Sequence, residues 1–144
     1  MKYYLSIDIG ASSGRHILSS VQNGKLILEE VYRFENGMTE KDGHLVWDYK
    51  KLFSDILQGM KECKKAGKIP VSVGIDTWGV DYALIDKAGE VIGDVFAYRD
   101  GRTAEPIKKL HSKIPFETLY ERTGSQFQIY NTIYQLYTDK LSGK

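Results

Sequence analysis

An aspartate and an arginine flank a loop of small residues close to the amino terminus. Asp8 lies near the end of an apolar run and is followed by Gly10–Gly14, which reads Gly-Ala-Ser-Ser-Gly, and then by Arg15. A loop without bulky side chains can direct several backbone N–H groups and two hydroxyls toward a phosphate. Arg15 adds a permanent charge with a planar donor geometry, and Asp8 suits a hydrated divalent cation beside that phosphate. The segment predicts a nucleotide-phosphate site.

The same segment also has a purely structural interpretation. Gly-Ala-Ser-Ser-Gly is an ordinary turn composition, and Asp8 can simply end a strand. The loop has neither the Gly-Lys-Ser/Thr of the Walker motif nor the spacing of the dinucleotide fingerprint, and both of those motifs open a helix. Residues 15–21 alternate like a strand instead. The phosphate interpretation therefore depends on the elements that surround the loop.

Apolar alternation predicts three strands around the loop. In Tyr3–Ile9 the apolar side chains share one face and Asp8 lies on the other. Arg15–Val21 and Lys25–Arg33 follow, and Asn23-Gly24 between them is a type I′ turn signal. The pattern predicts an antiparallel meander whose first hairpin is the Gly10–Gly14 loop, with further turns at 36–37 and 42–43.

A helix and a parallel strand are predicted next. Apolar residues recur at helical spacing at Tyr49, Leu52, Phe53, Ile56, Leu57, Met60 and Cys63. Asp48 suits the N-cap and Gly67 the carboxyl end, and we expect the whole stripe, with Cys63 as a core residue, to lie on a sheet. Val71–Thr77 is the following strand. A right-handed crossover would set it beside Tyr3–Ile9, so that Asp8 and residues 76–79 meet at the carboxyl ends of parallel strands.

Beyond this strand the pattern predicts a hairpin and a helical extension. Val80–Asp86 and Glu90–Tyr98 read as paired strands around a turn at Lys87–Gly89. A helix across Ala104–Ile114 accommodates Pro106 only in its first turn. A short helix from Phe116 should end at Gly124, and Asn131 is placed to cap a last helix.

Composition restricts the possible partners. The chain has 144 residues, one cysteine and a net charge of +1 with both signs interspersed. It therefore forms no internal disulfide, and its charge gives no reason to expect a nucleic-acid partner. Its apolar runs are strand-sized and its first residues lack the core of a secretory signal, so we expect a cytoplasmic protein without a membrane partner. The spacing of the three histidines does not suit a metal site.

Four segments together carry a family resemblance. Asp8–Arg15 resembles the first phosphate motif of the FGGY carbohydrate kinases, in their rhamnulokinase branch. Gly74–Tyr82, which begins Gly-Ile-Asp-Thr-Trp-Gly, resembles the next signature, and Ala97–Thr103 the one after it. Asn131–Leu136 continues the match. The similarity spans nearly the whole chain in order, and the Gly-Ile-Asp-Thr-Trp-Gly run is the most specific part.

The resemblance implies an α/β chain with the ribonuclease H-like (actin-like ATPase) fold and Mg²⁺- and ATP-dependent phosphorylation of L-rhamnulose at its 1-hydroxyl. By motif position, the ATP phosphates would contact Ala11, Ser12, Ser13, Gly14 and Arg15. Asp8 would face the magnesium ion through water. Gly79 would contact the ketose through its backbone, and Trp78 would either shape that pocket or serve as a core aromatic. For Arg99, Asp100 and Arg102 a structural ion-pair cluster is favoured over substrate contact.

The family is longer than this chain. We expect residues 1–144 to be the amino-terminal part of the first kinase domain, with an incomplete sheet and without the second domain. The general base is expected beyond Lys144, which predicts that the isolated chain is inactive. The alternatives are an actin-like ATPase without sugar specificity, a kinase for another ketose such as L-fuculose or xylulose, a ribonuclease H-type nuclease, or a partner-binding module that uses an open sheet edge.

Overall fold

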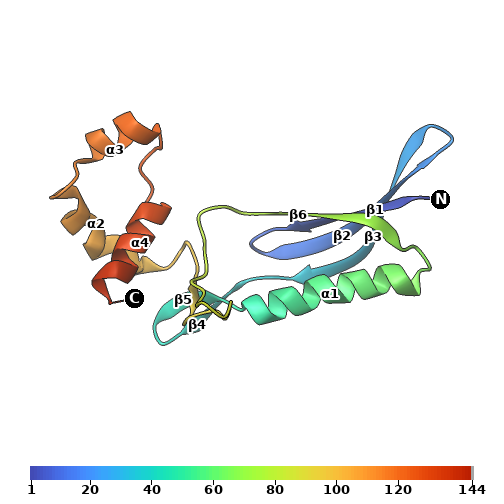
Figure 1. Cartoon of the computed structure of the whole chain (residues 1–144), viewed down its shortest axis with the longest axis horizontal. Coiled ribbons are helices and arrows are strands. Elements are labelled where there is room, and N and C mark those ends of the chain that lie inside the picture. The colour runs from blue at the N-terminus through green and yellow to red at the C-terminus, as the bar shows by residue number, and fades with distance from the viewer. Residues whose placement is uncertain (144) are drawn as a thin grey trace. The chain divides into compact units, whose positions relative to one another are not determined.

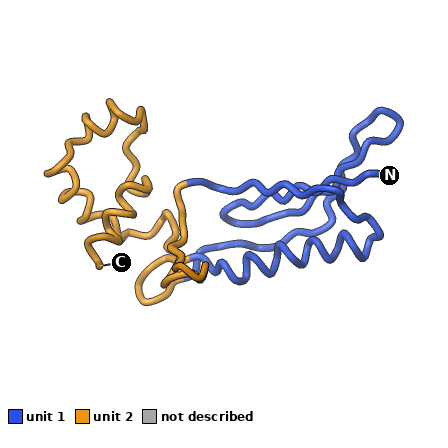
Figure 2. The backbone as a smooth tube through the Cα atoms, in the orientation of Figure 1, with its two compact units in different colours: residues 1–39, 47–79 blue, residues 40–46, 80–144 orange. Residues whose placement is uncertain are grey.

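The computed structural model describes residues 1–143 and divides the chain into two compact units (Figure 2). The first unit comprises residues 1–39 and 47–79, and the second comprises residues 40–46 and 80–144. Among the described residues, no helix combines the length and the apolar character that are needed to cross a bilayer.

The first unit is a sheet with one long helix. Its elements are β1 (Tyr3–Ile9), β2 (Ser13–Gln22), β3 (Lys25–Glu35), α1 (Tyr49–Lys65) and β6 (Pro70–Thr77). The sheet order is β3-β2-β1-β6, with β1 antiparallel to β2 and parallel to β6. The predicted meander, crossover helix and parallel strand are all confirmed.

The core of this unit lies between the sheet and α1 (Figure 1). Leu5, Ile7 and Ile9 point from β1 toward the helix, where Cys63 is fully buried. Burial raises the pKa of the Cys63 thiol, as expected for a core cysteine. Asp48 caps α1 as predicted, because its carboxylate accepts a hydrogen bond from the Lys51 N–H at 2.9 Å.

The apolar stripe of α1 is only partly covered, contrary to the prediction. Leu52 and Ile56 pack against the core, but Phe53 is 60% exposed, and Leu57 and Met60 are exposed as well. The stripe is wider than the sheet beneath it, because β6 forms the edge of the sheet in residues 1–143. Val71, Val73 and Ile75 of β6 are exposed too. An amphipathic pattern therefore identified the helix but not how much of its face is buried.

Short strands and helices make up the rest of the chain. A three-stranded sheet has the order β4-β5-β7, and the elements are β4 (Met38–Lys41), β5 (His44–Trp47), β7 (Val95–Phe96), a 3₁₀ helix η1 (Gly101–Thr103), α2 (Ala104–His111), α3 (Phe116–Thr123) and α4 (Thr132–Leu141). The predicted helices are confirmed, with Pro106 in the first turn of α2 and Gly124 ending α3 at a φ of 64°. Buried Ile107, Leu110 and Tyr134 join α2 to α4.

Two predictions for this region need correction. The predicted strands Val80–Asp86 and Glu90–Tyr98 reduce to a single bridge between Ile85 and Val91 and the two-residue β7, although the turn between them is present. Val80 has a φ of 68°, which is incompatible with a strand start. The hairpin β4–β5 was predicted only as a turn at Asp42-Gly43.

Candidate functional site

Three hydrogen bonds fix the conformation of the loop between β1 and β2. The Gly10 N–H donates to the Ser13 carbonyl at 2.8 Å, which makes the loop a tight hairpin turn. Asn36, just after β3, donates its backbone N–H to the Ser12 carbonyl at 3.0 Å and its side-chain amide to the Gly10 carbonyl at 2.9 Å. Asn36 therefore positions the loop, a role that the sequence did not reveal because Asn36-Gly37 reads only as a turn.

The close contact with Phe34 explains why residue 14 is a glycine. It is buried, and a Cβ at this position would fall 2.1 Å from the ring of Phe34. No side chain fits between the loop and that ring, so a glycine is required for the loop to lie this close to β3.

Charged side chains form a row across the sheet, close to the loop between β1 and β2. Asp8, Arg15 and Arg33 are direct cross-strand partners on β1, β2 and β3. The Arg15 guanidinium donates to the Asp8 carboxylate from Nε at 2.9 Å and lies 2.8 Å from it at Nη2. On the other side of β1, Asp76 of β6 is the register partner of Asp8. The row thus runs from two guanidiniums to two carboxylates.

The loop and this row enclose an open cavity of about 250 Å³. Its lining consists of Asp8, Gly10, Ser12, Ser13, Arg15 and Arg33. Of the predicted phosphate residues, the structure brings the two serines and Arg15 to this wall together with Asp8, while Ala11 is half-buried and Gly14 is packed under Phe34. Arg33 is an addition that the sequence did not predict. A concave surface of hydroxyls, backbone and arginine is suited to a phosphate group.

The cavity also fits a magnesium–phosphate complex. Magnesium is commonly held by one or two protein carboxylates together with substrate phosphates and water. Asp8 is the carboxylate in the cavity wall, and no group of three metal-ligating side chains occurs in residues 1–143. A cation here would therefore depend on Asp8 and on the phosphate oxygens.

The end of β6 lies beside the end of β1, as predicted. Ile9 and Thr77 are the last register partners of the two parallel strands, and Trp78 and Gly79 follow directly. Trp78 packs on the core and against Trp47, with ring centroids 4.4 Å apart, so its role as a core aromatic is supported. Gly79 is exposed, and a Cβ there would meet nothing within 4 Å. A ligand can thus approach its backbone closely.

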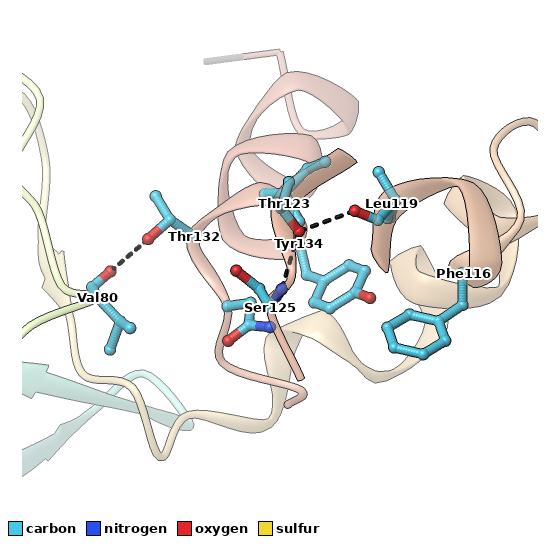
Figure 3. A pocket seen from close by; sticks show the side chains of 9 residues that line it. Val80, Phe116, Leu119, Thr123, Ser125, Thr132 and Tyr134 are labelled. Carbon is cyan, nitrogen blue, oxygen red and sulfur yellow. Dashed lines mark hydrogen bonds between the residues drawn. The ribbon is translucent and has the colours of Figure 1, made fainter. Parts of the chain in front are cut away.

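The second unit contains an apolar cavity of about 320 Å³ between α3 and the start of α4 (Figure 3). Phe116, Leu119 and Tyr134 are among the residues that form its apolar wall. The polar groups at its rim bond within the unit: the Thr132 hydroxyl donates to the Val80 carbonyl at 3.1 Å, and the Thr123 hydroxyl donates to the Leu119 carbonyl at 2.8 Å (Figure 3). Among the described residues no charged side chain lines this cavity, so it offers no cationic group to a phosphate.

The predicted cluster of Arg99, Asp100 and Arg102 is not a single ion-pair network. Arg102 pairs with Asp139 of α4 at 2.5 Å and donates to the Gln135 side chain at 3.1 Å. The buried Asp100 carboxylate instead accepts hydrogen bonds from the backbone N–H groups of Leu45 and Arg102 and lies 3.2 Å from His44 Nδ1. Arg99 stacks on Tyr98. Asp100 and Arg102 are therefore both buried, but their side chains bond to different partners.

Comparison with known proteins agrees with this geometry. Residues 3–137 match the FGGY family of carbohydrate kinases, N-terminal domain. The chain is 49% identical over 139 residues to a rhamnulokinase from Lactiplantibacillus plantarum and 45% identical over 136 residues to one from Bacillus subtilis. These alignments cover 96% and 94% of this chain, but only 28% of each relative's length.

Solved structures show the same fold at low sequence identity. The ligand-bound xylulose kinase from Lactobacillus acidophilus superposes with a TM-score of 0.75 at 18% identity, over 97% of this chain and 28% of the other. The Plasmodium falciparum glycerol kinase with ADP gives a TM-score of 0.75 at 18% identity, over 97% of this chain and 29% of the other. The actin-like ATPase fold is thereby confirmed, and the chain belongs to the FGGY family of carbohydrate kinases, whose N-terminal domain it matches.

Proposed function

We propose that this chain is the phosphate-binding part of an ATP-dependent kinase that phosphorylates the 1-hydroxyl of L-rhamnulose. The observation that carries the proposal is the polar cavity in which the loop, Asp8 and Arg15 converge. The name of the 44–49% identical relatives, rhamnulokinase, supplies the substrate. Since the chain spans about 28% of their length, both the activity and the substrate belong to the longer protein.

Each predicted residue has a defined part in this proposal. Backbone N–H groups of the loop from Ala11, the hydroxyls of Ser12 and Ser13, and the Arg15 guanidinium bind and orient the ATP phosphates. Gly14 contributes by letting the loop lie close to Phe34. Asp8 would hold magnesium, which would supply charge neutralisation to the phosphates. Gly79 lets the ketose approach the backbone, with Trp78 behind it. Phosphoryl transfer of this kind depends on positioning and on charge neutralisation more than on covalent chemistry.

The isolated chain should not turn over. The family resemblance implies a general base beyond Lys144, and a missing base costs a factor of about 10² to 10⁴ in rate. An open cavity also leaves the phosphates in water, where electrostatic stabilisation is weaker. Turnover of L-rhamnulose, ATP and magnesium by the purified 144-residue chain would contradict this expectation.

A chimeric enzyme tests the proposal directly. In it, this chain replaces the aligned amino-terminal region of the Lactiplantibacillus plantarum rhamnulokinase. We expect the chimera to phosphorylate L-rhamnulose in preference to L-fuculose and D-xylulose. A folded chimera without kinase activity would count against the proposal. A preference for another ketose would show that L-rhamnulose is the wrong substrate.

A pair of glycine variants tests whether this chain itself contacts the sugar. Gly79→Ala in the chimera should raise the KM for L-rhamnulose about tenfold and leave the KM for ATP unchanged, because the added methyl blocks close backbone approach. Gly74→Ala is the matched control: Gly74 lies on β6, and a Cβ there also meets nothing within 4 Å. Equal behaviour of the two variants would remove Gly79 from the sugar site.

A further inference from the structure

Arg33 is the second guanidinium in the wall of the phosphate cavity. It lies on β3, directly across the strand pair from Arg15, and lines the cavity together with the loop residues. Its side chain is 50% exposed. Arg33 lies outside the Asp8–Arg15 motif and outside every other segment that carries the family resemblance. Only the register of β2 and β3 brings it to the site.

Two neighbouring guanidiniums that face one cavity favour a multiply charged anion there. Like charges directly opposite each other on adjacent strands are unfavourable unless each is neutralised. In this structure Asp8 neutralises Arg15, and Glu30 neutralises Arg33 through two hydrogen bonds at 2.9 and 2.6 Å. The Glu30 carboxylate is 42% exposed, and exposed pairs of this kind contribute little to stability. A phosphate group can therefore replace Glu30 at Arg33 with little loss.

A β-bulge brings Glu30 beside Arg33. Residues three apart on a regular strand point to opposite faces of the sheet. Here the register steps from His16–Tyr32 to Ile17–Glu30, so that Val31 is the extra residue of β3. The extra residue turns Glu30 to the face that carries Arg33 and Arg15. Bulges that re-aim a side chain are frequent beside binding and active sites, and this one provides the carboxylate that holds Arg33 at the cavity.

We propose that Arg33 is a phosphate-binding residue of this site. Its guanidinium gives up its hydrogen bonds to Glu30 and binds the terminal phosphate of a nucleoside triphosphate together with Arg15. The inference rests on the proposed kinase function for the identity of the anion. The planar donors of two guanidiniums suit the several oxygens of a terminal phosphate, and charge-assisted pairs of this kind are the stronger hydrogen bonds. Glu30 keeps Arg33 oriented when it is not bound to phosphate.

The test uses the ¹⁵N-labelled 144-residue chain and magnesium tripolyphosphate as the probe. NMR follows the backbone amides of the loop and the Nε–H signals of Arg15 and Arg33 during the titration. We expect the loop amides and both arginine signals to shift together. Arg33→Gln should weaken the affinity at least about tenfold, the loss expected for one charged hydrogen-bonding partner. Arg33→Lys, which keeps the charge but not the fork, should weaken it less.

Two further variants test whether Arg33 acts by direct contact with the phosphate or only through the net charge of the chain. Glu30→Gln should strengthen tripolyphosphate binding about two- to threefold, because it removes the competing carboxylate. Arg122→Gln on α3 is the matched control, since it makes the same substitution at an exposed arginine of the second unit; its affinity should equal that of the unmodified chain. The dispersion of the amide spectrum reports whether each variant is folded.

The possible failures are distinguishable. If tripolyphosphate shifts the loop amides but Arg33→Gln binds as tightly as the unmodified chain, the role of Arg33 is wrong and the phosphate site stands. If the loop amides do not respond to tripolyphosphate, the phosphate site of the proposed function fails and Arg33 fails with it. If Glu30→Gln weakens binding, the proposed exchange is wrong.

Discussion

Gly59 of α1 lies directly against the imidazole ring of His16 on β2. A Cβ on Gly59 would fall 2.3 Å from the nearest ring carbon, and His16 has no exposed surface. His16 Nε2 is 3.0 Å from the Ile56 carbonyl, so this ring nitrogen donates a hydrogen bond to the backbone of the same helix. The rings of Tyr32 and Phe34 on β3 contact the imidazole in T-shaped arrangements. The helix can approach the sheet this closely only because residue 59 is a glycine.

Gly59→Ala should therefore destabilise the first unit although alanine favours helices. Overpacking a closed core costs about 1–3 kcal/mol, whereas the gain in helix propensity is at most about 1 kcal/mol. We expect a net loss of about 1–2 kcal/mol in the free energy of unfolding, measured by urea titration. Ser54→Ala, on an exposed position of α1, is the control and should be neutral or slightly stabilising. If the two variants were equally stable, the sheet would have to shift to accommodate the added methyl, and the prediction would be wrong.

The stability of the first unit should fall as the pH drops below about 6.5. Burial lowers the pKa of His16, outweighing the hydrogen bond to Ile56 and the charge of Asp55, which raise it. Nδ1 is buried without a hydrogen-bond partner among the described residues, so a second proton there is unfavourable. The unfolded chain then binds a proton at a higher pH than the folded chain. The stability is complete above the unfolded pKa and is lost as the pH falls toward the folded pKa.

Unfolding experiments between pH 7.5 and 5 measure this effect. The slope cannot exceed about 1.4 kcal/mol per pH unit for one proton. His16→Leu should reduce the slope over this range, even if it lowers the overall stability. An unchanged slope in His16→Leu would assign the pH dependence to other groups.

Replacing Asp139 or Arg102 alone should destabilise the second unit far more than replacing both together. Their side chains are 9% and 7% exposed and form a buried ion pair, to which the Tyr82 hydroxyl adds a hydrogen bond at 2.5 Å. Burial and the Asp139 carboxylate raise the pKa of Tyr82, so its hydroxyl stays protonated and donates. Removing one partner of a buried pair costs about 3–5 kcal/mol, because the other charge is left unpaired.

Asp139→Leu alone should therefore destabilise the second unit strongly. The double variant Arg102→Met with Asp139→Leu should recover most of that loss, because no charge is then left buried. A double-variant cycle in thermal or urea unfolding measures the coupling. Additive losses from the two substitutions would mean that the ion pair is not energetically coupled.

Asp8→Asn should change the magnesium requirement of the chimeric kinase. A carboxylate that holds a metal through water typically contributes about 10- to 100-fold to metal affinity or activity. We expect the magnesium concentration for half-maximal activity to rise at least about tenfold in Asp8→Asn. Asp42→Asn is the control, because Asp42 lies in the β4–β5 turn with a φ of 52°, which asparagine tolerates. An unchanged magnesium requirement would remove Asp8 from the cation site.

The sequence alone determined the elements whose pattern is local. Strand alternation, the Asn23-Gly24 turn and the stripe on α1 predicted the meander, the crossover helix and the parallel order of β1 and β6. The small residues between Asp8 and Arg15 predicted the tight loop that joins β1 to β2. These signals lie within a few residues of one another, and each depends on backbone preference or on periodicity.

Tertiary structure alone decided which distant side chains meet. The bulge at Val31 sets Glu30 on the face of Arg33, and the β2–β3 register brings Arg33 to the loop. Asn36 reaches back to Gly10, and Arg102 pairs with Asp139 rather than with Asp100. Periodicity tells which face a side chain occupies but not which residue lies opposite. That choice depends on register, bulges and packing, and these are set by the whole fold.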